Sequence, residues 1–181
     1  FHYVGKQTIW SDTNDFGDKA FAIPKSINLT NIKNLRVSNS PYLSLPDLKI
    51  FENLETLEIN NHLDENKENY KTLPSFKYLK NFSINMYYPT IKEEEKEPLK
   101  NLENSKNLES INIDGIHATR YNFETDVERW SLSDVKLDKI SSLKKLKQLR
   151  IDGISLEGLK ELKNLNNIEK FELTNPTVIT K

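Results

Sequence analysis

Seven short segments of the chain share one spacing of hydrophobic and polar positions, apolar-x-x-apolar-x-apolar. Their apolar residues are, in chain order, Ile32, Leu35 and Val37; Leu54, Leu57 and Ile59; Leu79, Phe82 and Ile84; Leu108, Ile111 and Ile113; Val127, Trp130 and Leu132; Leu146, Leu149 and Ile151; and Ile168, Phe171 and Leu173. Successive segments begin 22, 25, 29, 19, 19 and 22 residues apart. Alternation of apolar and polar residues is typical of a strand that buries one side. The pattern predicts seven short strands, which bury a continuous core only when they stack.

The residues between these segments carry a second hydrophobic pattern, in which apolar positions are often three residues apart. The first connecting stretch contains Leu45, Leu48 and Phe51, and the sixth contains Ile154, Leu156, Leu159, Leu162 and Leu165. A three-residue spacing matches the period of a 3-10 helix. We therefore expect each strand to be followed by a helical, 3-10 or irregular return segment.

The whole unit resembles the leucine-rich repeat, and the 22-residue units are similar to bacterial internalin-type repeats. The resemblance covers roughly residues 20–176. It implies an α/β solenoid: an arc of about seven units, with short parallel strands on the concave side and the returns on the convex side. We accordingly divide the chain into an N-terminal cap or remnant of an upstream region at 1–20, a leucine-rich-repeat domain at 21–176 and a tail at 177–181.

The chain departs from the family at one characteristic position. The family usually has Asn three residues after the last apolar residue of the strand, where its side chain satisfies backbone groups of the turn. The residues here are Ser40, His62, Tyr87, Ile116, Val135, Ile154 and Pro176, so a ladder of asparagines is absent at that position. A glycine precedes Ile116 and Ile154, and Gly115 and Gly153 are therefore expected to make the turns there.

Composition excludes several kinds of chemistry. The absence of cysteine rules out disulfides, zinc-thiolate sites and a thiol nucleophile. With 26 basic and 27 acidic side chains the net charge is −1, which argues against a nucleic-acid partner. No segment is long and apolar enough to span a bilayer. Since no phosphate-binding glycine loop, Gly-x-Ser-x-Gly or His-Glu-x-x-His motif occurs, we expect no catalytic, cofactor or metal site, and no enzyme activity.

Two aspartates are candidate metal ligands, because each follows the last apolar residue of its strand. In a seven-strand stack Asp114 and Asp152 belong to the fourth and sixth strands. Stacked strands lie about 4.8 Å apart, so these carboxylates are expected about 10 Å from each other. That separation is too great for both to ligate one Ca²⁺ ion. Asp134, next to Ser133 of the intervening segment, could contribute a third carboxylate, but a metal site is not expected.

The residues between the apolar positions of each strand point away from the core and line the predicted concave side. They are mixed charges and small amides, which favour a protein or peptide partner. The candidate contact residues on this side are Asn34, Arg36, Thr56, Glu58, Asn85, Asn112, Asp114, Arg129, Ser131, Gln148, Arg150 and Asp152. The alternative is that this side is solvated scaffold, and that inserted loops or a neighbouring domain bind the partner.

Insertions lengthen the second and third units. They contain the charged runs 64–69 and 92–98, which are expected to be solvated, and a tyrosine pair, Tyr87 and Tyr88. Tyrosine is enriched in protein interfaces, so this pair is a second candidate contact site.

Three functions remain open at this point. The first is a non-catalytic protein-protein interaction module within a larger bacterial protein, which the resemblance places at the cell surface or outside the cell rather than in the cytoplasm. The second is a structural spacer solenoid. The third is the substrate-recognition arm of a larger enzyme. Uncapped ends of the stack would also allow self-association.

Overall fold

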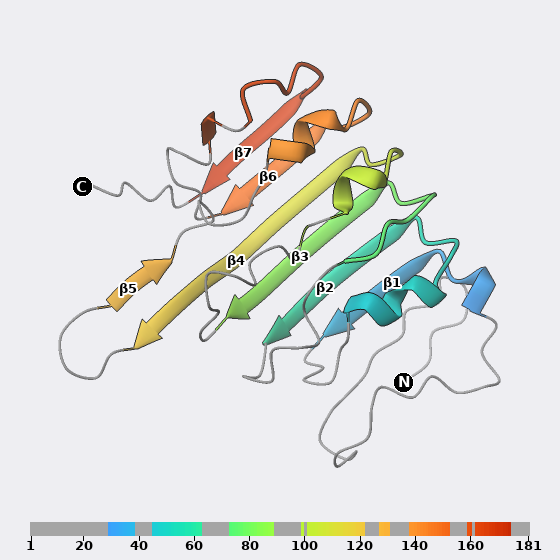
Figure 1. Cartoon of the computed structure of the whole chain (residues 1–181), viewed down its shortest axis with the longest axis horizontal. Helices are drawn as coiled ribbons and strands as arrows, with labels where there is room; N and C mark the ends of the chain where they lie inside the picture. The colour runs from blue at the N-terminus through green and yellow to red at the C-terminus, as the bar shows by residue number, and fades with distance from the viewer. Residues whose placement is uncertain are drawn as a thin grey trace, which may run out of the picture.

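The computed structural model describes residues 29–38, 45–62, 73–88, 99, 101–121, 127–130, 138–152, 159–160 and 162–174. The predicted cap at 1–20, the charged runs 64–69 and 92–98, and the tail 177–181 lie outside the described residues. Within them the chain is a parallel β-solenoid, in which strands far apart in sequence lie side by side in one sheet (Figure 1).

Six strands of the described chain run parallel, in the spatial order β1-β2-β3-β4-β6-β7. Their bounds are β1 (Asn34–Ser38), β2 (Thr56–His62), β3 (Asn81–Tyr88), β4 (Ser110–Tyr121), β6 (Gln148–Asp152) and β7 (Lys170–Thr174). The predicted 3-10 returns are present as η2 (Leu29–Asn31), η3 (Leu45–Ile50), η6 (Leu102–Asn104) and η8 (Asp138–Ser142).

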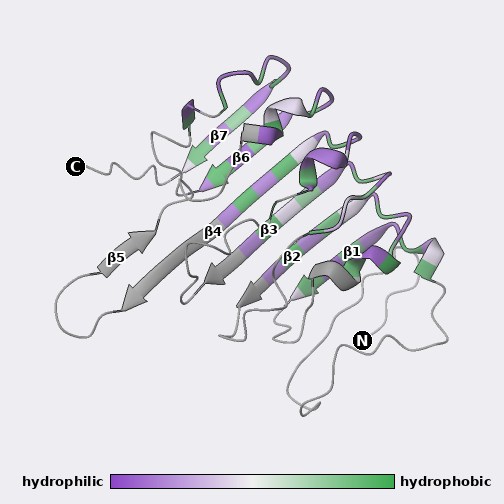
Figure 2. Cartoon of the chain, in the orientation of Figure 1, coloured by the Kyte–Doolittle hydropathy of each residue, from purple (hydrophilic) through white to green (hydrophobic). Residues whose placement is uncertain are grey.

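Neighbouring strands pair so that the apolar positions form continuous columns, seen as alternating colours along the strands in Figure 2. One column contains Leu35, Leu57, Phe82, Ile111, Leu149 and Phe171; the next contains Val37, Ile59, Ile84, Ile113, Ile151 and Leu173. From β1 to β6 every member is at most 2% exposed. Each fully buried side chain contributes about 1.5–3 kcal/mol. A slip of one residue would turn an entire strand's apolar set to solvent, so burial fixes the register.

The fifth predicted strand is not part of the parallel stack. Residues 127–130 form β5 (Val127–Trp130), which pairs antiparallel with β4, with Ala118 opposite Trp130 and Tyr121 opposite Val127. The first part of β4 pairs directly with β6. The prediction of seven parallel units is therefore wrong at this unit. The two predicted steps of 19 residues are a single step of 38 residues between neighbouring parallel strands. The hydrogen bond from Lys145 to Asn107 joins two residues with this same separation.

Gly115 lies within β4, at a bulge between Asp114 and His117, and not at the predicted turn. Asn85 pairs with Asp114, but Tyr87 pairs with His117, so β4 has one more residue than β3 over this stretch. Glycine in a strand interior commonly marks such a bulge, since it has no side chain to place. The bulge lets β4 continue to Tyr121, and its extension is the part that β5 pairs with. The second predicted glycine turn, at Gly153, lies outside the described residues.

Candidate functional site

The sheet has a core side and an open face. The open face consists of the residues that alternate with the apolar columns, and most are half-buried or exposed. Its first column is Asn34, Thr56, Asn81, Ser110, Gln148 and Lys170; its middle column is Arg36, Glu58, Ser83, Asn112, Arg150 and Glu172. Its third column is Ser38, Asn60, Asn85, Asp114, Asp152 and Thr174, of which Asp152 is buried.

Ten of the predicted contact residues lie together on this open face. They are Asn34, Arg36, Thr56, Glu58, Asn85, Asn112, Asp114, Gln148, Arg150 and Asp152. Arg129 does not belong to its predicted column, because it pairs with Thr119 in the β4–β5 hairpin. Ser131 lies outside the described residues. Tyr87 and Tyr88 end strand β3 instead of beginning a loop, and the structure describes their backbone only.

Each end of the open face carries charged side chains, and these form ion pairs within that end. On the β1–β2 end, Arg36 Nε lies 3.1 Å from Glu58 Oε1. On the β6–β7 end, the Arg150 guanidinium lies 3.8 Å from both Asp114 and Glu172. Lys170 Nζ lies 2.8 Å from Glu172 Oε1, and this hydrogen bond lowers the pKa of Glu172.

Between these charged ends lies a region of amides and hydroxyls, which we call the neutral strip. It comprises Thr56, Asn60, Asn81, Ser83, Asn85, Ser110 and Asn112, from β2, β3 and β4. Two contacts between neighbouring strands order it: the Asn112 amide donates to Ser83 Oγ at 3.1 Å, and the Asn81 amide donates to Thr56 Oγ1 at 3.5 Å. Such groups both donate and accept hydrogen bonds, so the strip can engage a polar partner of either kind.

A second set of charged residues lies immediately before the parallel strands. It was not predicted from the sequence. The residue immediately before each parallel strand alternates strictly in sign along the stack: Lys33, Glu55, Lys80, Glu109, Lys147 and Glu169. We call this set the charge ladder. In the sequence the second position of the repeat pattern also includes Glu128 of the fifth segment, which interrupts the alternation. The signs alternate strictly only once β5 is known to lie outside the parallel stack.

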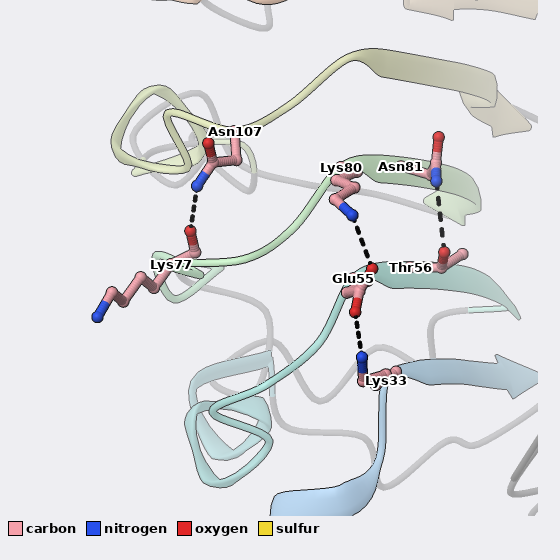
Figure 3. A network of polar contacts seen from close by, with 7 residues as sticks. All are labelled: Lys33, Glu55, Thr56, Lys77, Lys80, Asn81 and Asn107. Atoms are coloured by element: carbon pink, nitrogen blue, oxygen red, sulfur yellow. Dashed lines mark hydrogen bonds and ion pairs between the residues drawn. The ribbon is translucent and has the colours of Figure 1, made fainter.

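Glu55 is the best-defined rung of the charge ladder (Figure 3). Its two carboxylate oxygens accept from Lys33 Nζ at 2.7 Å and from Lys80 Nζ at 2.8 Å. These hydrogen bonds lower the pKa of Glu55 to about 2, and the Glu55 carboxylate in turn raises the pKa of Lys80. Farther along the stack Lys147 lies 2.9 Å from Glu169, and this hydrogen bond raises the pKa of Lys147.

Asparagines do form a ladder, at a position different from the one that the family resemblance implied. Three of them stand immediately before the first apolar residue of a unit and donate to a backbone carbonyl of the preceding unit. The pairs are Asn53 with Thr30 at 2.8 Å, Asn107 with Lys77 at 2.7 Å, and Asn167 with Lys144 at 2.7 Å. We call these contacts the amide ladder; Figure 3 shows the Asn107 rung. They satisfy carbonyls of the return turns that no β-strand reaches.

Asp114 and Asp152 lie on neighbouring strands, and the expected separation of two strands is wrong because β5 does not intervene. Their surroundings are those of structural carboxylates. Arg150 lies next to Asp114, and the Thr174 hydroxyl donates to Asp152 Oδ1 at 2.7 Å. Among the described residues no group of three or more His, Cys, Asp or Glu side chains is placed to hold a metal ion.

Within the part of the chain that the structure describes, no helix has the length and apolar character needed to cross a membrane. No protein-family model matches the chain, and no curated protein matches it.

Proposed function

We propose that the chain is a non-catalytic protein-interaction module of the leucine-rich-repeat type, which binds a protein or peptide partner across the open face of its sheet. The repeat type is supported by the 22-residue separations of Lys33 from Glu55 and of Asp152 from Thr174, and by the 3-10 returns. The resemblance to internalin-type repeats supports a place in a larger bacterial protein that is secreted or displayed at the cell surface.

The neutral strip is the observation that carries this proposal. Its amides and hydroxyls cost less free energy to remove from water than ionised groups do, and they regain hydrogen bonds in a complex. The strip lies on three paired strands whose register is fixed, so little conformational entropy is lost when a partner binds. The charged pairs on either side are suited to the rim of an interface, where they orient the partner more than they add affinity.

A display library of random peptides, panned against the immobilised chain, tests this proposal. We expect enriched peptides whose capture is lost in the Ser83→Arg and Asn112→Arg variants, because each places a long charged side chain in the strip. Asn104→Arg is the matched control, since Asn104 is an exposed residue of the η6 return. Enriched peptides that bind all three variants equally would refute binding at the open face.

A structural spacer is the second candidate, and the two ladders favour it. The charge ladder and the amide ladder both use polar side chains to join consecutive units, which stiffens the stack without any partner. A spacer predicts that panning enriches no sequence-specific peptide. That result would exclude the interaction module and leave the spacer.

A further inference from the structure

A concentration of lysines lies at the edge of the sheet where the middle strands begin. Residues 77–80, 106–109 and 144–147 immediately precede β3, β4 and β6, and together they contain six lysines and one glutamate. The equivalent residues of the units on either side, 52–55 and 166–169, contain glutamate and no lysine. The net charge of the whole chain is only −1, so this basic excess is local. We call residues 77–80, 106–109 and 144–147 the basic block.

Hydrogen bonds between units hold the three segments of the basic block side by side. Lys80 O accepts from Glu109 N at 2.8 Å, and Glu109 O accepts from Lys147 N at 2.9 Å. The side chain of Asn107 also donates to Lys77 O at 2.7 Å. Neighbouring strands lie about 4.8 Å apart, so the backbone of the block spans about 10 Å across the stack. The lysines of the block are therefore close enough to contact one short ligand.

Three lysines of the basic block carry charges that the stack does not use. Lys77, Lys106 and Lys144 are exposed and form no ion pair with any described residue. They occupy the same position in consecutive parallel units, three residues before the charge ladder, and we call them the lysine row. Figure 3 shows the Lys77 side chain pointing away from the charge ladder. By contrast, Lys80 and Lys147 lie 2.8 Å and 2.9 Å from glutamates of that ladder. The lysine row is therefore available to an anionic ligand.

An exposed tyrosine lies beside the lysine row. Tyr78 is 42% exposed and occupies the position at which Asn53 and Asn107 form the amide ladder. Lys77 Nζ lies 5.0 Å from the centre of the Tyr78 ring. Tyrosine combines an apolar ring with a hydroxyl that donates hydrogen bonds, and it is enriched in protein interfaces. Tyr78 therefore suits a ligand that has both aliphatic stems and carboxylates.

We propose that the basic block binds an acidic segment of a partner polypeptide, which crosses the stack and places consecutive aspartates or glutamates against the lysine row. An extended chain rises about 3.3–3.4 Å per residue, so about three or four residues span the block. Lysine carries its charge on a flexible four-carbon stem, so the row adapts to carboxylates whose spacing differs from that of the units. The site lies at the edge of the sheet and not on its open face, so it does not depend on the proposed open-face binding.

The limits of the basic block favour a short acidic segment over a nucleic acid. The charge of a nucleic acid continues along its whole strand. Beyond the block such a strand would meet Glu52 and Glu55 on one side and Glu169 on the other. The block also contains lysine and no arginine, so it lacks the planar guanidinium that binds phosphate through two parallel hydrogen bonds. An acidic polypeptide segment places its charge only where the lysines lie.

A hexaglutamate peptide with blocked ends is a suitable probe, and hexaglutamine is its neutral counterpart. Titrated into the full chain at about 20 mM salt, where charges are weakly screened, hexaglutamate should shift the amide resonances of Lys77, Lys106 and Lys144. The double variant Lys106→Gln with Lys144→Gln should bind it about twofold to thirtyfold more weakly, which is the range for two exposed ion pairs. Lys49→Gln with Lys163→Gln is the control, because it removes the same charge from exposed residues of other units. No shift in the lysine row, equal weakening by both double variants, or equal binding of hexaglutamine would overturn the proposal.

Other occupants of the basic block would give different results. A single-stranded hexathymidylate that binds more tightly than hexaglutamate, and loses this binding in the Lys106 and Lys144 double variant, would identify a nucleic acid. Binding of hexaglutamate only after Glu93→Gln, Glu94→Gln and Glu95→Gln would show that an acidic run of the same chain covers the block. Self-association of the unmodified chain that the Lys106 and Lys144 double variant abolishes would identify a second copy. Each of these results would overturn a separate acidic partner.

Discussion

The Nζ atom of Lys33 lies 2.7 Å from Oε1 of Glu55, although 22 residues separate the two in the chain. Each residue immediately precedes its strand, and the two strands are neighbours in the stack. The contact shows that the repeat aligns surface charges as well as apolar residues. Because Glu55 also holds Lys80, one carboxylate joins three consecutive units.

The shared carboxylate predicts a specific dependence of stability on pH. The pKa of Glu55 falls from 4.5 to about 2 in the folded chain, so its contribution is complete above pH 4.5 and is lost as the pH falls toward 2. The Glu55→Gln variant should be less stable than the unmodified chain at pH 6, and the gap should close between pH 4.5 and 2. Thermal unfolding at a series of pH values measures this gap. Glu52→Gln, at an exposed turn residue, is the control. A Glu55→Gln gap that stays constant over that range would contradict the ion pairs.

Two phenylalanines at the same repeat position should differ in how much they stabilise the fold. Phe82 on β3 is 2% exposed and Phe171 on β7 is 47% exposed. Phe82→Ala should cost about 3–5 kcal/mol of unfolding free energy, because it removes buried surface and leaves a cavity. Phe171→Ala should cost only about 1–2 kcal/mol, because its ring is half in water and no closed cavity forms. Urea unfolding measures both losses, and equal losses would show that β7 is covered in solution.

Replacing Asn107 of the amide ladder should lower the free energy of unfolding, although this residue lies at the surface. Asn107 donates to Lys77 O at 2.7 Å and accepts from Lys145 Nζ at 2.6 Å, so it links three units. Asn107→Ala should cost about 0.5–1.5 kcal/mol, the usual net value of a hydrogen bond that is lost. Asn104→Ala, three residues earlier and exposed, should change stability by less than about 0.5 kcal/mol. If the two variants unfold at the same urea concentration, the amide contact contributes nothing in solution.

Hydrophobic spacing was sufficient to predict where the seven strands and the 3-10 returns lie, because each strand alternates apolar and polar residues. It placed six of the strands correctly in the parallel stack, but the predicted place of the strand at Val127 and Trp130 was wrong. A hairpin strand has the same two-residue periodicity as a stack strand, and spacing alone does not reveal whether its partner is parallel or antiparallel. The turn predicted at Gly115 was wrong for a similar reason, since a glycine favours a bulge as readily as a turn.

Some of the polar features were likewise predictable from the sequence, and others were not. Most predicted open-face residues lie together, because side-chain direction follows from the strand period. Arg129 was misplaced together with its strand. The charge ladder went unnoticed because its members, such as Glu55 and Lys80, are 25 residues apart and become neighbours only when the strands are in register.

The continuous open face depends on β4 and β6 being direct neighbours, and an engineered disulfide tests that relationship most directly. Asn112 on β4 pairs with Arg150 on β6. Adjacent strands lie about 4.8 Å apart, within the span that a disulfide bridges. The chain has no cysteine of its own, so Asn112→Cys with Arg150→Cys forms the only available bridge. The six-strand order predicts rapid oxidation of this pair. It predicts slow oxidation of Ser110→Cys with Arg129→Cys, which would be neighbours in a seven-strand parallel stack, because Arg129 pairs with Thr119 instead. Preferential oxidation of the Arg129 pair would contradict the six-strand order.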